Sequence, residues 1–374
     1  MFDGPPLRLA LEATSLLGAR TGIGAMTRAL VDRLATVPGI EVTGLAVSWR
    51  GRAAVADELP AGMASHPLQF PARLAHWLWA RVDHPRLDGF DVVHGPNFVV
   101  PPVAGAASLV SVHDFGPWHD PASCTRSARA YPRLVARALD RGAHVHVDSA
   151  FVGREAIEIL GVEPERVHHI ALGFDPQSQG SSVRGRAMVD GSDYVLALGT
   201  IEPRKDHPNL VAAMAEVWTT HPDVRLVVVG PDGWGTPAFD AACARHAVGD
   251  RVVRLGYVDQ RARADLLAGA ACLSFASRYE GFGLPPLEAM AAGTPVVAST
   301  AGSLPEICGG AAEMVPPGEP AALAKAITAV IDDRERAAEL VRLGRVQTSR
   351  FSWDVTAEGF MSLYRHLAEQ HQRL

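Results

Sequence analysis

Short apolar runs alternate with amphipathic segments along the whole chain, a pattern typical of α/β proteins. Runs such as VLALG (195–199) and RLVVVG (225–230) have no polar face, which indicates parallel strands covered by helices on both sides. The predicted strands span residues 7–13, 41–47, 91–94, 108–113, 144–148, 166–171, 194–199, 225–229, 252–255, 271–275, 295–298 and 312–315. The predicted helices span residues 24–37, 123–141, 150–160, 209–219, 260–268, 286–292, 320–332 and 353–374. Two open sheets fit this length better than one.

The two series of strands are separated by residues 175–193, which are rich in Gly, Ser, Gln and charge and lack periodicity. We interpret this stretch as an interdomain linker, with a long loop inside one domain as the alternative. The predicted organisation is an N-terminal domain over 1–176, a linker over 177–192 and a second domain over 193–351. A C-terminal helix over 352–374 follows and could pack back on the first domain.

Composition excludes several classes of protein. The chain has 374 residues, 48% hydrophobic and 20% charged, with a net charge of −6, so disorder is not its dominant state. The slight acidity argues against nucleic-acid binding through a broad basic surface, and no apolar run is long enough for a transmembrane helix. Four isolated cysteines without metal-ligand spacing and the lack of a signal-peptide pattern predict a reduced, cytoplasmic protein.

The most informative stretch is RYEGFGLPPLEAMAAGTPVVAST (278–300), which lies between two predicted strands. A loop, a short helix and a turn therefore follow the carboxyl end of a strand, where open α/β sheets bind ligands. Pro285 and Pro286 suit a helix start, which places Glu288 in the first turn. Together with Glu280 in the loop, it could bind the hydroxyls of a sugar and a ribose. For Glu288 alone, a favourable interaction with the helix dipole is the simpler interpretation.

Three other segments follow predicted strands. In GTIEPRKDHPN (199–209), the adjacent Arg204 and Lys205 could clamp a diphosphate, or form an exposed loop with Asp206 as a helix N-cap. Lys205 is one of only two lysines among 35 basic residues. In GARTGIGAM (18–26), a glycine loop opens a helix but lacks the full dinucleotide fingerprint. In SVHDFGPWHDP (111–121), His113 could contact a sugar hydroxyl, or pair with Asp114 to cap the strand.

In combination, these segments resemble the retaining nucleotide-sugar glycosyltransferases of family 4, which have two Rossmann-like domains with parallel sheets facing across a cleft, the GT-B fold. The matching segments are GTIEPRKDHPNLVAAM, RLVVVGPDGW, VVRLGYVD, the stretch 278–300, SLPEI, TGIGAMTRAL, DVVHGPN and VHDFGPWHDP. The resemblance covers nearly the whole chain. Asp206 and His207 stand where Asn is frequent, and Ala292 stands where Cys is common.

The resemblance implies a role for each matching residue. Glu288 would bind the donor ribose, Glu280 the transferred sugar, and Arg204 and Lys205 the diphosphate. The backbone of Phe282, Gly283 and Leu284 would contact the sugar and the phosphate, and the backbone of Tyr257 and Val258 would receive the base. His113 would contact the sugar. Gly22 and Gly24 would lie near the diphosphate and the acceptor.

The implied reaction moves a hexose, with retention and without a metal or cofactor, to a glycan, lipid-linked or small glycoside acceptor. GDP-mannose is the first expected donor and a UDP-sugar the second. A sugar-nucleotide epimerase, a glycan phosphorylase and an NAD-dependent dehydrogenase are alternatives from other classes. A glycosidase would leave the basic pair without an anion, and a non-catalytic binding protein would leave the sugar and phosphate groups unexplained.

The segment LAHWLWARV (74–82) carries two tryptophans flanked by arginines. It could contact a membrane surface peripherally, which would place the protein at the inner face of the membrane. An ordinary core helix with aromatic packing is the favoured interpretation.

Overall fold

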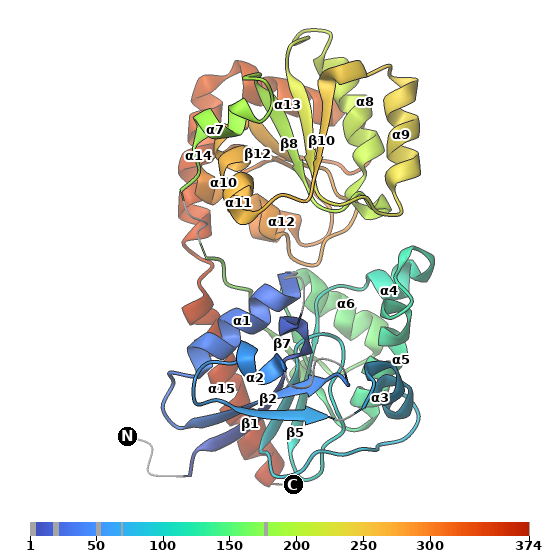
Figure 1. Cartoon of the computed structure of the whole chain (residues 1–374), viewed down its shortest axis with the longest axis vertical. Coiled ribbons are helices and arrows are strands. Elements are labelled where there is room, and N and C mark those ends of the chain that lie inside the picture. The colour runs from blue at the N-terminus through green and yellow to red at the C-terminus, as the bar shows by residue number, and fades with distance from the viewer. Residues whose placement is uncertain (1–4, 18–21, 50–53, 69, 176–178, 374) are drawn as a thin grey trace. The chain divides into compact units, whose positions relative to one another are not determined.

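The computed structural model describes residues 5–17, 22–49, 54–68, 70–175 and 179–373. The chain forms two compact units (Figure 1). Unit 1 comprises residues 1–173 together with 352–374, and unit 2 comprises residues 174–351. Each unit contains one parallel sheet.

Unit 1 contains a seven-stranded parallel sheet in the order β3-β2-β1-β4-β5-β6-β7. The strands are β1 (Leu7–Glu12), β2 (Ile40–Val47), β3 (Ala64–Leu68), β4 (Val92–Gly95), β5 (Ala107–Val112), β6 (His144–Val147) and β7 (Val167–His169). The α-helices are α1 (Gly22–Leu34), α2 (Ala54–Glu58), α3 (Ala72–Trp79), α4 (Gly116–His119), α5 (Tyr131–Asp140), α6 (Ala150–Leu160) and α15 (Trp353–Gln372). Strand β3 is absent from the predicted strands because ASHPL contains a proline and little apolar surface, which suits its position at the sheet edge.

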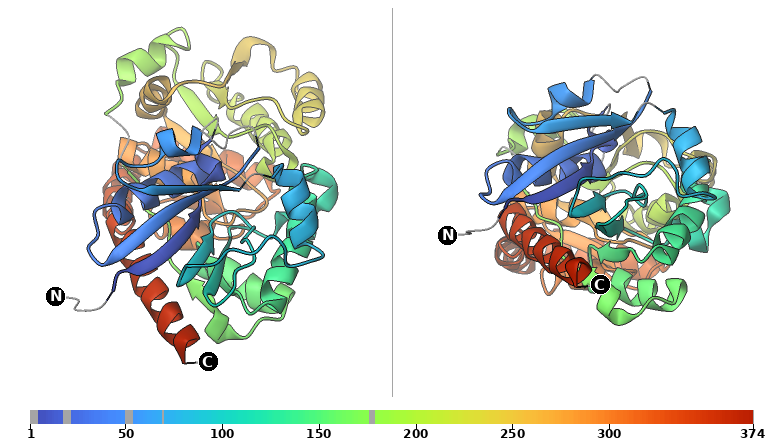
Figure 2. Two further views of the ribbon diagram at one scale, coloured as in Figure 1. Left: turned by 60° about the horizontal axis from the view of Figure 1, so that its bottom comes forward. Right: turned by 90° about the horizontal axis from the view of Figure 1, so that it is seen from below.

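Helix α15 returns from the end of the chain to unit 1. It packs on α1 and contacts β1, β4 and β5. Figure 2 shows this helix, in red, beside the blue N-terminal strands. Its buried side chains recur at helical spacing, among them Phe360, Tyr364 and Leu367, and Thr356 Oγ1 donates a hydrogen bond to the carbonyl of Ala171. This amphipathic face covers apolar strands that would otherwise lack a helix.

Unit 2 contains a six-stranded parallel sheet in the order β10-β9-β8-β11-β12-β13. The strands are β8 (Tyr194–Leu198), β9 (Arg225–Val229), β10 (Val252–Gly256), β11 (Cys272–Phe275), β12 (Val296–Ser299) and β13 (Glu313–Val315). The α-helices are α7 (Ser182–Ala187), α8 (His207–Val217), α9 (Thr236–Arg245), α10 (Gln260–Gly269), α11 (Leu284–Ala292), α12 (Leu304–Cys308), α13 (Pro320–Asp332) and α14 (Arg334–Thr348). Strands β8 and β11 pair although two strands separate them in sequence, so the strand order reverses between them.

Within the predicted interdomain linker over 177–192, residues 182–187 form α7, which packs on α10 of unit 2. Asp265 of α10 accepts two hydrogen bonds from the guanidinium of Arg184 and one from the backbone of Ser181. A short helix rich in Arg and Gly has no clear apolar periodicity, and its stability comes from these tertiary contacts. Residues 177 and 178 lie outside the described residues.

The predicted helix over 123–141 is too long, since α5 begins at Tyr131, where Pro132 suits the first turn. Short 3-10 turns over Pro121–Ser123 and Ala128–Ala130 precede it. Helices α2, α4, α9, α12 and α14 were not predicted. In α14, charged residues are as numerous as apolar ones, which conceals its narrow buried stripe.

Candidate active site

Two loops of unit 2 meet where the strand order of the sheet reverses. Arg204 and Lys205 follow β8, and Glu280 follows β11. Since β8 and β11 are hydrogen-bonded neighbours, their carboxyl ends bring these side chains together. The carboxylate of Glu280 accepts one hydrogen bond from each cation, at 2.7 Å from Arg204 Nη1 and 2.6 Å from Lys205 Nζ. The structure therefore places three of the predicted site residues in one cluster.

The cluster is a partly buried ionic network. The side chains of Lys205 and Glu280 are only 10% and 8% exposed, whereas that of Arg204 is 41% exposed. Glu202 provides a second carboxylate for Arg204, at 2.7 Å from its Nε. The Lys205 ammonium also lies over the ring of Phe275, 4.3 Å from its centroid. Arg204 thus has the more solvent-accessible charge, while Lys205 is fixed by its neighbours.

Burial and charge oppose each other at these two residues. Burial disfavours the charged form of Lys205 and lowers its pKa, although the carboxylate of Glu280 acts in the opposite direction. Burial also disfavours ionised Glu280, but the charges of Lys205 and Arg204 outweigh it and hold the pKa of Glu280 below its usual value. Glu280 is therefore ionised at neutral pH, and its carboxylate favours the charged form of the Lys205 side chain beside it.

The loop that carries Glu280 is held by the start of α12. The backbone N–H of Ser303 donates to the carbonyl of Glu280 at 3.0 Å, and Ser303 Oγ donates to the carbonyl of Phe282 at 2.6 Å. Gly302 has a φ of +61°, and a Cβ there would lie 2.3 Å from the carbonyl oxygen of Glu280. Neither residue was predicted from the sequence as part of the site, although the motif SLPEI begins with Ser303.

A second ion pair joins the two loops of the site. Arg278 Nε lies 2.9 Å from a carboxylate oxygen of Asp206, and the backbone N–H of Arg278 donates to the carbonyl of Arg204 at 2.7 Å. Asp206 occupies the position before α8 with a φ of +51°, but its side chain makes no capping hydrogen bond. The N-cap interpretation of Asp206 is therefore wrong for its side chain, which instead connects the loops.

Helix α11 begins at Leu284, directly after Gly283, whose φ of +112° favours glycine. Pro285 and Pro286 occupy its first turn, as predicted. Glu288, however, is the fifth residue of the helix and lies beyond the first turn, so the expected interaction with the helix dipole is wrong. The early helix start explains the shift. Glu288 instead pairs with Arg263 of α10, whose Nε lies 2.8 Å from its carboxylate.

The remaining residues that were predicted to contact the donor were predicted to do so through their backbone. Within the part of the chain that the structure describes, no acceptor receives a hydrogen bond from the amides of Phe282 or Gly283, so both can meet a ligand. Tyr257 and Val258 follow β10 at the edge of the sheet, and the side chain of Tyr257 is largely exposed.

His113 lies in unit 1, directly after β5. Its Nδ1 is 2.6 Å from a carboxylate oxygen of Asp148, and its Nε2 is 2.7 Å from the carbonyl oxygen of Pro96. Because both partners are acceptors, both ring nitrogens must donate, which requires an imidazolium. Burial opposes this charge, but Asp148 raises the pKa of His113 to about 9. The predicted pairing with Asp114 is wrong, since Asp114 instead accepts a hydrogen bond from the backbone of Gly116.

Behind His113, a chain of buried polar side chains crosses the sheet to α15. Tyr364 Oη lies 2.7 Å from His94 Nδ1, His94 Nε2 lies 2.9 Å from Ser111 Oγ, and Ser111 Oγ lies 2.9 Å from His146 Nδ1. Burial lowers the pKa of His146 to about 4, so this histidine is neutral at pH 7. The C-terminal helix thus completes the polar core next to the site residue.

The carboxyl edge of the first sheet also forms a small pocket. Gly22 and Gly24 begin α1, and the preceding residues 18–21 of the predicted glycine loop lie outside the described residues. A pocket of about 210 Å³ is lined by Glu12, Asn97, Tyr131 and neighbouring side chains. Strands β1 and β4 pair here across the reversal of the strand order, as β8 and β11 do in unit 2.

The helix predicted from LAHWLWARV is α3, and its two tryptophans differ. Trp79 is fully buried and donates a hydrogen bond to the carbonyl of Pro85, as expected for a core helix. Trp77 is 53% exposed, and Leu74 on the same helix is also exposed. The core interpretation therefore holds for one face of α3 only.

Two features are absent from the residues that the structure describes. No helix in this part of the chain is long and apolar enough to cross a membrane. No group of three or more His, Cys, Asp or Glu side chains is placed there to hold a metal ion.

The chain has two α/β units with parallel sheets, and the candidate site lies where the strand order of the second sheet reverses. These features are those of the GT-B glycosyltransferases. Solved structures with this fold align over nearly the whole chain. Sucrose-phosphate synthase from Thermosynechococcus elongatus gives a TM-score of 0.73 at 22% identity, covering 97% of this chain and 99% of that one. WaaG, a glycosyltransferase of lipopolysaccharide biosynthesis, gives 0.70 at 17% identity, covering 96% and 99%.

Within this class, the chain belongs to glycosyltransferase family 4. Residues 20–178 match the family described as Glycosyltransferase Family 4, and residues 183–347 match Glycosyl transferases group 1. The O-antigen chain mannosyltransferase B of Escherichia coli is 29% identical, covering 93% of this chain and 96% of that protein. D-inositol 3-phosphate glycosyltransferase of Acidothermus cellulolyticus is 33% identical over 58% of this chain, and the match spans about half of that relative, 52%.

Proposed function

We propose that this chain is a retaining, metal-independent hexosyltransferase that uses a nucleotide-sugar donor. GDP-mannose is the first candidate for this donor. The observation that carries the proposal is the cluster in which Arg204 and Lys205 share the carboxylate of Glu280. A fixed pair of cations at the carboxyl ends of two paired strands suits a diphosphate. The adjacent carboxylate suits the hydroxyls of the sugar attached to it.

In the proposed reaction, the bond between the anomeric carbon and the diphosphate oxygen breaks, and the electron pair leaves with the diphosphate. Arg204 and Lys205 stabilise the negative charge that develops on this leaving group. The backbone amides of Phe282 and Gly283 add neutral donors at the start of α11. The leaving phosphate accepts the proton of the acceptor hydroxyl while that oxygen bonds to the anomeric carbon from the same face. The scheme requires no side-chain nucleophile, metal ion or cofactor.

The remaining donor contacts follow from the same placement. Glu288 would accept hydrogen bonds from the ribose hydroxyls, in which case its present partner Arg263 holds the carboxylate in place. The backbone at Tyr257 and Val258 would receive the base. His113 would donate to the sugar through its Nε2 N–H, which must exchange the carbonyl of Pro96 for a sugar hydroxyl. Gly22 and Gly24 would leave room for the diphosphate and the acceptor.

The choice of mannose is supported by the Escherichia coli mannosyltransferase, because it matches this chain over nearly its full length. A UDP-sugar is the second candidate, since a structural neighbour, Anabaena HepE, was solved with UDP and glucose. A thermal-shift screen of the GDP, UDP and ADP series decides between them, because a ligand stabilises the folded state according to its affinity. GDP and GDP-mannose are expected to give the largest shifts.

The proposed acceptor is a hydroxyl of a glycan, a lipid-linked sugar or a small glycoside. The proposed location is the cytoplasm, with peripheral contact to the inner face of the membrane where the acceptor is lipid-linked. The exposed face of α3, described above, supports this contact.

The transfer chemistry is tested by Lys205→Ala with a labelled donor. Losing one charged phosphate contact is expected to cost about 2–4 kcal/mol of transition-state stabilisation, which corresponds to a fall in turnover of about 30- to 900-fold. The matched control is Lys325→Ala, because Lys325 is the chain's other lysine and lies exposed on α13 of the same unit. Unchanged turnover in Lys205→Ala would remove the diphosphate clamp from the mechanism.

A further inference from the structure

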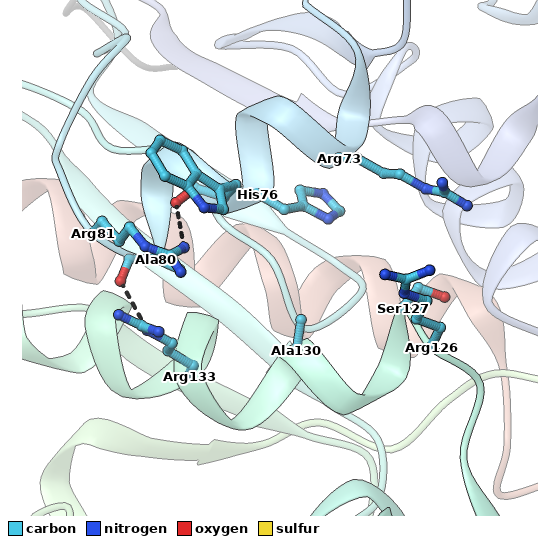
Figure 3. Close-up of a pocket in the computed structure, with 9 residues that line it drawn as sticks. Arg73, His76, Ala80, Arg81, Arg126, Ser127, Ala130 and Arg133 are labelled. Carbon is cyan, nitrogen blue, oxygen red and sulfur yellow. Dashed lines mark hydrogen bonds between the residues drawn. The ribbon is translucent and has the colours of Figure 1, made fainter.

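A pocket of about 460 Å³ lies in unit 1 between α3 and the segment that leads into α5. Four arginines line it, Arg73 and Arg81 from the α3 side and Arg126 and Arg133 from the α5 side. Figure 3 shows these side chains around the pocket, with His76 and Ala130 between them. No acidic side chain lines the pocket, so the charge of its arginines is not balanced within the lining.

These arginines lack carboxylate partners. None of the four forms an ion pair within 4 Å among the residues that the structure describes, whereas most other arginines of unit 1 pair with Asp or Glu. Arg133 donates to the carbonyl of Ala80, and Arg81 donates to the carbonyl of Trp77 and stacks over its ring. The backbone bonds orient the two guanidinium groups without neutralising them. Four like charges on exposed side chains repel one another unless an anion is present.

An apolar face accompanies this charge. Leu74, Trp77 and Val82 are exposed on α3 and just beyond its end. Tryptophan beside arginine on one helix face is typical of segments that lie in a membrane interface, where the ring enters the headgroup region and the cations meet phosphates. A soluble phosphate ligand would account for the arginines but not for the exposed Leu74 and Trp77.

We propose that this pocket is a binding site for the phosphate of an anionic phospholipid headgroup, and that α3 docks on the membrane surface with Trp77 inserted beside it. The inference extends the membrane contact of the proposed function and is independent of the transfer chemistry. The shared chemistry is a phosphate oxyanion held by guanidinium groups. The exposed apolar side chains favour a lipid over a free phosphate as its source.

The test is co-sedimentation of the full chain, without donor or acceptor, with vesicles of phosphatidylglycerol and phosphatidylcholine. The variant Arg73→Ala/Arg126→Ala is expected to reduce the partition coefficient about 25-fold, because each basic residue near an anionic surface contributes about fivefold, which is about 1 kcal/mol. The control Arg334→Ala/Arg350→Ala removes the same charge from exposed positions of unit 2 and is expected to retain wild-type binding. Trp77→Ser is expected to weaken binding at constant charge.

Three results would overturn the proposal. The wild-type chain could fail to sediment with anionic vesicles at low salt, or the control pair could lose as much binding as the pocket pair. In the third result, inorganic pyrophosphate raises the melting temperature through Arg73 and Arg126 while vesicles do not bind, which assigns the pocket to a soluble phosphate. Donor-dependent thermal shifts and turnover with a soluble acceptor test the proposed function separately, so failure of one can be told from failure of the other.

Discussion

Replacing Glu280 by Gln tests whether the ionic cluster of unit 2 is energetically coupled. The substitution keeps the shape of the side chain but removes the negative charge that Lys205 and Arg204 share. Lys205 then remains almost fully buried over the ring of Phe275, and it has no other carboxylate within ion-pair distance among the residues that the structure describes. Because the variant leaves a buried charge without its main partner, we expect a lower free energy of unfolding.

The magnitude follows from the burial of the pair. Removing one partner of a fully buried ion pair costs about 3–5 kcal/mol, and the half-exposed Arg204 places this cluster near the lower end, about 3 kcal/mol. For a unit of this size, the melting temperature should fall by about 6–12 °C. The control Glu202→Gln removes a carboxylate that contacts only the more exposed Arg204, and about 1 kcal/mol is expected.

The assay combines thermal unfolding with nucleotide binding. In the wild-type chain, the carboxylate of Glu280 competes with the diphosphate for Arg204 and Lys205. Without this carboxylate, GDP should stabilise Glu280→Gln more than the wild-type chain, while turnover falls. Equal melting temperatures for Glu280→Gln and wild type would refute the coupling. Weaker GDP binding in Glu280→Gln than in Glu202→Gln would refute the assignment of Arg204 and Lys205 to the diphosphate.

Two further predictions concern the supports of the site. In Gly302→Ala, the new Cβ would meet the carbonyl of Glu280 at 2.3 Å in a left-handed conformation, so urea denaturation should show a loss of at least about 2 kcal/mol and reduced GDP binding. Gly310→Ala, where nothing lies within 4 Å, serves as its control, and equal effects in both would refute the steric argument. The folded-state pKa of His113, about 9, lies above its unfolded value of about 6.5, so its contribution of about 3 kcal/mol is complete below pH 6.5 and is lost as the pH rises through 9. Urea denaturation between pH 6 and 9.5 should show this decrease in the free energy of unfolding in wild type and in the control His371→Gln, but not in His113→Gln. If the decrease persists in His113→Gln, another group causes the pH dependence.

The sequence predicted the fold class from local patterns. Strands such as 225–229 and helices such as 150–160 and 320–332 were predicted with their observed bounds. The pattern of apolar residues within each segment is enough to indicate a buried strand or an amphipathic helix. Elements whose stability depends on partners far away in the chain were missed. Edge strand β3 and helix α7 belong to this group, since their pairing or ion pairs compensate for weak local signals.

For the site, the sequence supplied the residue types, and the tertiary structure decided their partners. Arg204, Lys205 and Glu280 could be singled out because each follows a predicted strand. That they share one carboxylate depends on the pairing of β8 with β11, which no local pattern reveals. The pairs Arg263–Glu288 and His113–Asp148 also depend on the tertiary structure, because their residues lie 25 and 35 positions apart in the chain. Side-chain preferences act over a few neighbouring residues, whereas ion pairs form wherever packing brings opposite charges together, so only the folded chain determines them.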